Sequence, residues 1–151
     1  MEQKLYDTVT DCPVIAAIKD DAGLERCLDS DIQIVFVLYG DIVSIPEIVD
    51  RIKKKGKLAM VHADLISGLA GKEIAIDFLK RNTQADGIIS TKLSFIKRAK
   101  ELGMATVFRF FVIDSMAFDN IQKQYEAACP DFVEILSLIH ISEPTRRRGI
   151  S

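Results

Sequence analysis

The chain has 151 residues, of which 48% are hydrophobic and 28% are charged, and its formal net charge is -2. These values predict one globular domain and exclude a bulk electrostatic attraction to nucleic acid. The apolar run 32–39 ends at Gly40 and Asp41 and is too short to cross a bilayer. The three cysteines lack the spacing of metal ligands, and residues 1–11 lack the apolar core of a signal peptide. We therefore expect a cytoplasmic protein with reduced thiols and without membrane, metal or cofactor.

An apolar strand followed by an amphipathic helix recurs along the chain. The sequence predicts six strands, at 13–19, 32–39, 58–64, 85–90, 105–111 and 132–136. Helices are expected at 20–28, at 44–56, from about 72 onward, at 93–103 and at 115–129. Strands begin about 20 to 25 residues apart, too far for hairpins, so the economical arrangement is a parallel sheet with helical crossovers.

Local patterns also predict how two of these helices begin. Ser44 and Glu47 have the spacing of a capping box, with Pro46 in the first turn. In the helix after residue 72, we expect Ile74, Phe78 and Leu79 to face the core.

The stretch 58–64 is the centre of the prediction, because it is apolar on both faces until His62 and Asp64. Such a strand is typical of a parallel sheet covered by helices. An open sheet and a closed barrel both fit, but polar residues at nearly every strand end favour one shared mouth and hence the barrel. These residues are Lys19, Asp41, Asp64, Thr91, Lys92, Asp114 and Glu134. We expect an α/β fold, an incomplete TIM-like (β/α)8 barrel with six units, the last strand lacking its helix.

The same strand ends supply the candidate ligand-binding residues, and each also has a purely structural interpretation. Lys19 either meets an anion or lies along the rim, and Asp64 is a ligand contact or a paired carboxylate. His62 lies deeper and is either a contact or a structural histidine. Thr91 and Lys92 begin a helix, where free backbone N–H groups favour an anion, or they are merely a cap and a solvated lysine. Gly68 either lets the backbone approach a ligand or serves only the geometry of its loop.

Arg109 and Glu134 are the remaining candidate ligand-binding residues, and they lie inside the apolar strands 105–111 and 132–136. Because an isolated buried charge costs several kcal/mol, we predict that both side chains face the interior of the barrel and pair with each other.

Residues 137–151, SLIHISEPTRRRGIS, differ in character from the rest of the chain. They show no helical periodicity and contain three consecutive arginines. A disordered basic tail and a nucleic-acid contact are both conceivable. We favour a third interpretation, translated non-native sequence, so that the domain covers 1–136 and the tail is disordered.

Six segments resemble the glycerol uptake operon antiterminator regulatory proteins, which are glycerol-3-phosphate-responsive antiterminators. They are PVIAAIKD (13–20), VFVLYGDI (35–42), VHADLISGLAGKE (61–73), ADGIISTK (85–92), RFFVIDSMA (109–117) and FVEIL (132–136). The resemblance implies a compact barrel that responds to glycerol 3-phosphate, binds an mRNA leader and regulates genes of glycerol utilisation. RNA binding depends on this resemblance alone, since the sequence shows no stacking-aromatic motif.

Where the family continues into strands seven and eight, this chain shows only residues 137–151. Barrels usually hold phosphate on the loops after those strands, so we expect that this chain, as written, does not bind glycerol 3-phosphate with useful affinity. Unpaired edges on the first and last strands would favour a homo-oligomer. An alternative from another class is a TIM-barrel enzyme for a phosphorylated small molecule, with Asp64 or Glu134 as general base and Lys19 or Lys92 holding phosphate.

Overall fold

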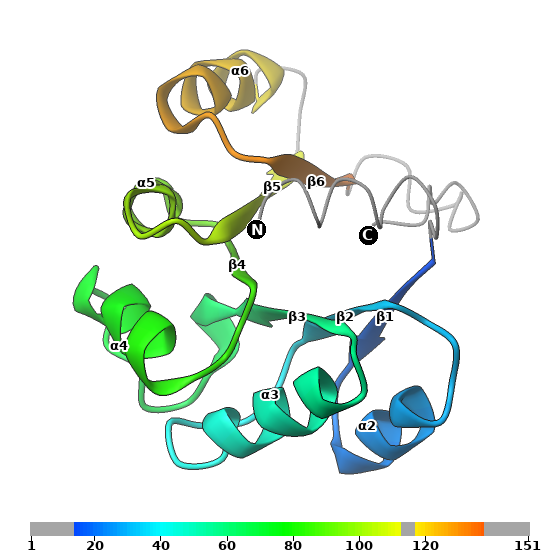
Figure 1. Ribbon diagram of the computed structural model, residues 1–151. Helices are drawn as coiled ribbons and strands as arrows, with labels where there is room; N and C mark the ends of the chain where they lie inside the picture. Colours follow the sequence, from blue (N-terminus) through cyan, green and yellow to red (C-terminus); the bar gives the residue numbers. More distant parts are fainter. Residues whose placement is uncertain (1–13, 113–116, 138–151) are drawn as a thin grey trace.

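The computed structural model describes residues 14–112 and 117–137, in which strands and helices alternate (Figure 1). The strands are β1 (Ile15–Ile18), β2 (Ile34–Val37), β3 (Leu58–His62), β4 (Gly87–Ser90), β5 (Ala105–Val112) and β6 (Phe132–Ser137). The α-helices are α2 (Asp21–Leu28), α3 (Ile45–Lys54), α4 (Ile74–Asn82), α5 (Leu93–Glu101) and α6 (Ala117–Ala128), and a short 3-10 helix, η1 (Ala63–Leu65), follows β3.

The six strands form one sheet in chain order, and every neighbouring pair is parallel. Figure 1 shows the sheet curled into part of a barrel with the helices outside it. The predicted parallel order and the incomplete barrel are therefore confirmed. Within the described residues, β1 and β6 are the edges of the sheet.

Alternation along the strands divides the apolar residues into an outer and an inner core. The outer core packs helices against strand residues such as Val35, Val61 and Phe108, which are fully buried. The inner core lies on the concave face and contains Ile34, Phe36, Leu58, Met60, Ile89, Ala105 and Val107. All five residues of β3 are buried, as a sheet covered on both faces requires.

The amino edge of the sheet is held by a contact that occurs twice. Asp86, directly before β4, accepts the Ala59 N–H of β3 at 2.8 Å and pairs with Lys53 of α3 at 2.7 Å. Asp131, directly before β6, accepts the Thr106 N–H of β5 at 2.8 Å and pairs with Lys100 of α5 at 3.2 Å. Each aspartate thus links a helix, the strand after it and the next strand. We call these two contacts the amino-edge latches.

The structure corrects the predicted cap of α3 and one of the three core positions predicted in α4. Ser44 is itself helical in backbone conformation and makes no side-chain cap; instead the Asp41 carboxylate accepts the N–H groups of Val43 and Ser44 at 2.9 and 2.8 Å. The capping box fails because the turn begins three residues earlier, at Asp41. Ile74 is 66% exposed, since it is the first residue of α4 and the buried stripe falls on Ala75, Ile76 and Leu79. Phe78 is half-buried against the outer core, and Leu79 is buried as expected.

Two further predictions, the polar strand end at Asp114 and the tail, concern residues at or beyond the limits of the described chain. Asp114 and 138–151 lie outside the described residues, and β6 extends one residue further than predicted, to Ser137.

Candidate functional site

Polar side chains gather where β3, β4, β5 and β6 approach their carboxyl ends. They are His62, Asp64, Ser90, Thr91, Arg109 and Glu134. Because parallel strands bring their carboxyl ends to one edge, side chains far apart in the sequence meet there. We refer to these six residues as the mouth cluster.

Asp64 is held by the end of β4. The sequence places it on the strand, but β3 ends at His62 and Asp64 lies in η1, which turns its carboxylate toward the next strand. There Oδ1 accepts the Ser90 hydroxyl at 2.7 Å, and Oδ2 accepts the hydroxyl and the N–H of Thr91 at 2.7 and 2.9 Å. Burial would raise the pKa of Asp64, but these hydrogen bonds together outweigh it and hold the pKa below its usual range.

These hydrogen bonds favour the structural interpretation of Thr91 and Lys92 at the start of α5. The Thr91 N–H is used by Asp64, and the Lys92 N–H donates to the Ser90 hydroxyl at 3.0 Å. Neither amide is available to a ligand. Sequence analysis missed Ser90, although a serine ending an otherwise apolar strand is a signal that could have identified it.

Arg109 and Glu134 form the predicted buried pair. They are direct partners in the register of β5 and β6, and Arg109 Nε lies 2.6 Å from Glu134 Oε1. The side chains are 14% and 0% exposed, so water screens the pair poorly. The second oxygen, Glu134 Oε2, is buried and has no hydrogen-bond partner. This prediction, including its register, is confirmed.

His62 is 2% exposed, and both of its ring nitrogens are buried without a hydrogen-bond partner. Burial lowers the pKa of His62, and the charge of Arg109 lowers it further, against the opposing carboxylates of Asp64 and Glu134. The imidazole is therefore neutral at pH 7, with one nitrogen a donor and the other an acceptor. A buried polar group without a hydrogen bond costs about 1–3 kcal/mol. A ligand that supplied the missing hydrogen bonds to His62 would therefore gain binding free energy in this part of the cluster.

The remaining candidates lie around this cluster rather than in it. Lys92 is exposed, and its Nζ lies 4.8 Å from the centre of the Phe95 ring and directly over Gly71, where an added Cβ would meet it at 3.3 Å. Gly68 has φ +91°, and an added Cβ would contact Ile42 at 3.2 Å, so geometry alone explains this glycine. Lys19 is exposed beyond β1, and no contact in the described part of the chain joins it to the mouth cluster.

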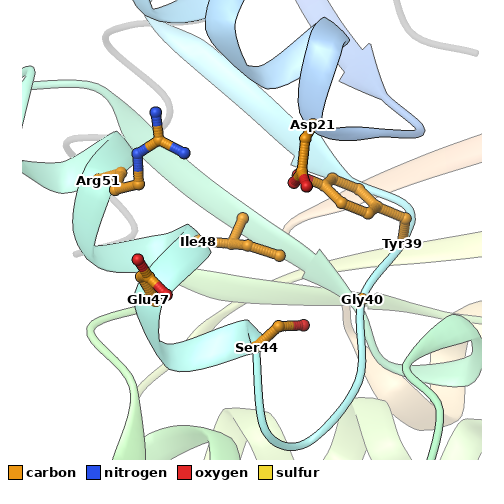
Figure 2. A pocket seen from close by; sticks show the side chains of 7 residues that line it. All are labelled: Asp21, Tyr39, Gly40, Ser44, Glu47, Ile48 and Arg51. Atoms are coloured by element: carbon orange, nitrogen blue, oxygen red, sulfur yellow. The ribbon is translucent and has the colours of Figure 1, made fainter.

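A hollow of about 240 Å³ opens between α2 and α3 (Figure 2). Several of its polar groups have partners: the Tyr39 hydroxyl donates to Asp21 at 2.7 Å, and Arg51 pairs with Glu25. Over 14–112 and 117–137 there is neither a cluster of three or more potential metal-ligating side chains nor a helix long and apolar enough to span a membrane. The mouth cluster is therefore the better candidate site.

Comparison with proteins of known sequence adds the family. A model of the glycerol-3-phosphate responsive antiterminators matches residues 14–144. An Escherichia coli K12 protein, the uncharacterized protein YgcP, is 50% identical over 124 residues, which are 82% of this chain and 65% of that protein. The chain thus spans about two thirds of this relative's length.

Solved structures agree with the sequence match. A glycerol uptake operon antiterminator regulatory protein from Listeria monocytogenes is 32% identical with a TM-score of 0.78, over 82% of this chain and 66% of that one. An antiterminator-related protein from Thermotoga maritima is also 32% identical, with a TM-score of 0.73, over 91% and 78% of the two chains. The 3-dehydroquinate dehydratase of Aquifex aeolicus, 11% identical with a TM-score of 0.59 over 83% and 67%, shares the fold alone. The chain belongs to the glycerol-3-phosphate-responsive antiterminator family.

Proposed function

We propose that this chain binds glycerol 3-phosphate at the mouth cluster and thereby controls antitermination on an mRNA leader. The observation that carries the ligand site is the pair of buried, unpartnered groups, the His62 ring and Glu134 Oε2, at the carboxyl edge of the sheet. Buried polar side chains without partners are rare in folded proteins, and here they coincide with the edge where barrels bind small molecules. Family membership supplies the identity of the ligand, and we infer the mRNA partner and the cytoplasmic location from it.

The chemistry of the cluster supports a binding protein better than an enzyme. A general base needs an available lone pair, whereas Asp64 accepts three hydrogen bonds that lower its pKa. Glu134 is tied to Arg109 through one oxygen. Lys19 has no contact with either carboxylate within the described residues. The alternative of an enzyme that uses Asp64 or Glu134 as its general base is therefore less well supported, and regulation is the function we favour.

We expect modest affinity. The exposed Lys92, whose Nζ would lie 3.3 Å from a Cβ added at Gly71, could meet a phosphate, and a solvent-competed contact contributes only about 1 kcal/mol. A dissociation constant of about 1 mM corresponds to about -4 kcal/mol of binding free energy. Binding of this strength at about 20 mM ligand would still raise the free energy of unfolding by about 2 kcal/mol.

Urea unfolding of the whole chain, with and without about 20 mM sn-glycerol 3-phosphate, tests the ligand. Sodium sulfate at equal ionic strength controls for salt, because the salt alone also stabilises folded proteins. A midpoint that rises with glycerol 3-phosphate and not with sulfate supports the proposal, and equal midpoints refute it. A gel-shift assay on leader mRNA, with and without the ligand, tests the second half of the proposal.

A further inference from the structure

The described chain leaves its unpartnered buried polar side-chain atoms in one place. These atoms are the two ring nitrogens of His62 and Oε2 of Glu134. Both residues lie on the concave side of the sheet, and the charges of Glu134 and Arg109 act on His62. As whole residues, His62 and Glu134 are 2% and 1% exposed, so bulk water does not satisfy them. They form the inner polar end of the mouth cluster.

We propose that this inner end is a hydroxyl subsite, which takes the vicinal hydroxyl groups of a polyol phosphate and excludes its phosphate group. The inference rests on the proposed function and adds the orientation of the ligand. It also assigns His62 and Glu134 as the residues that select a polyol over other phosphate esters.

The donor and acceptor inventory of these groups argues for neutral hydroxyls. A neutral imidazole offers one donor and one acceptor, and Glu134 Oε2 offers an acceptor only. A hydroxyl group both donates and accepts, so two neighbouring hydroxyls can satisfy all three atoms. A dianionic phosphate ester has no proton to donate to Glu134, and any phosphate anion would be repelled by its carboxylate. A divalent metal is also a poor fit, since the described residues contain no group of three potential ligands.

The charge on Glu134 is already balanced, which explains why the subsite does not call for a cation. Arg109 Nε donates to Oε1 at 2.6 Å and leaves only Oε2 open. The inner end is therefore neutral overall.

The imidazole nitrogens of His62 give a direct test. The chain has two histidines, His62 and His140, so a His140→Gln variant assigns the nitrogen signals in a two-bond ¹H–¹⁵N spectrum. The full chain is titrated at constant pH with glycerol, with inorganic phosphate and with glycerol 3-phosphate in separate samples. Added free histidine reports the bulk effect of each solute.

We expect glycerol and glycerol 3-phosphate to shift the His62 nitrogens, and inorganic phosphate to leave them unchanged. The subsite is refuted if the His62 nitrogen chemical shifts do not change with glycerol, or if they change with inorganic phosphate instead.

The same measurements separate this inference from the proposed function. If glycerol 3-phosphate stabilises the chain against urea but His62 does not respond, the ligand is right and the subsite is wrong. If glycerol shifts His62 but glycerol 3-phosphate neither shifts it nor stabilises the chain, the subsite stands and the proposed ligand falls.

Discussion

Removing one partner of the Arg109–Glu134 pair should destabilise the protein far more than removing both. Arg109 Nε is the hydrogen-bond partner of Glu134 Oε1, and Oε2 has none, so Arg109→Met leaves a carboxylate that is 0% exposed without compensation. Breaking a buried pair in this way costs about 3–5 kcal/mol. Glu134→Leu should cost less, about 2 kcal/mol, because Arg109 is 14% exposed and can turn its charge toward water.

The double variant Arg109→Met/Glu134→Leu removes both charges and fills similar volume with apolar atoms. We expect its free energy of unfolding to lie within about 1 kcal/mol of the wild type, since such replacements are often neutral or stabilising. Urea unfolding measures all four proteins, and with a slope of about 2 kcal/mol per molar the Arg109→Met midpoint should fall by about 2 M.

The coupling free energy between the two substitutions tests whether Arg109 and Glu134 stabilise the fold as a pair. If the double variant loses the sum of the two single losses, the pair is not an electrostatic unit and the reasoning is wrong. A single variant that does not fold leaves the test intact, because the double variant should then recover folding.

Three further predictions use the same unfolding assay. Asp86→Asn should cost about 2–4 kcal/mol because it breaks a buried latch, whereas Asp77→Asn, in a partly exposed pair, should cost at most about 1 kcal/mol. The pKa of His62 is lowered in the folded state, so below about pH 6.5 the unfolded chain binds a proton at this residue that the folded chain does not. The free energy of unfolding of the wild type should therefore fall as the pH is lowered, whereas that of His62→Gln should stay constant across the same range. Gly87→Ala would place a Cβ 2.3 Å from a β5 carbonyl and should cost about 3 kcal/mol, whereas Gly23→Ala, with a nearest contact of 3.2 Å, should change stability by less than about 1 kcal/mol.

The sequence predicts the parts of this structure that follow from periodicity. Strands with two apolar faces, spaced for helical crossovers, lead to the parallel order, and the parallel order makes Arg109 and Glu134 neighbours. The charge pair was therefore predictable, because it needs only the identity of adjacent strands and the rule that buried charges are paired.

The details of the mouth cluster were less accessible to sequence analysis. Asp64 leaves the strand because its carboxylate finds Ser90 and Thr91, which are 26 and 27 residues away and have no signature near Asp64 itself. The unpartnered state of His62 is equally a tertiary property, since it depends on what fails to approach the ring. Such partners become visible only once the strands are laid side by side.

The amino and carboxyl ends of the strands differ in whether their buried polar side chains have partners. At the amino edge, Asp86 and Asp131 each accept a strand amide and pair with a lysine from a helix. At the carboxyl edge, His62 and one oxygen of Glu134 are buried without partners in the same sheet. Because native folds satisfy most buried polar groups, an excess of unsatisfied groups at one edge is not a general looseness of packing. This contrast is the reason that we propose the ligand site at the carboxyl ends of the strands, where a ligand would supply the missing hydrogen bonds.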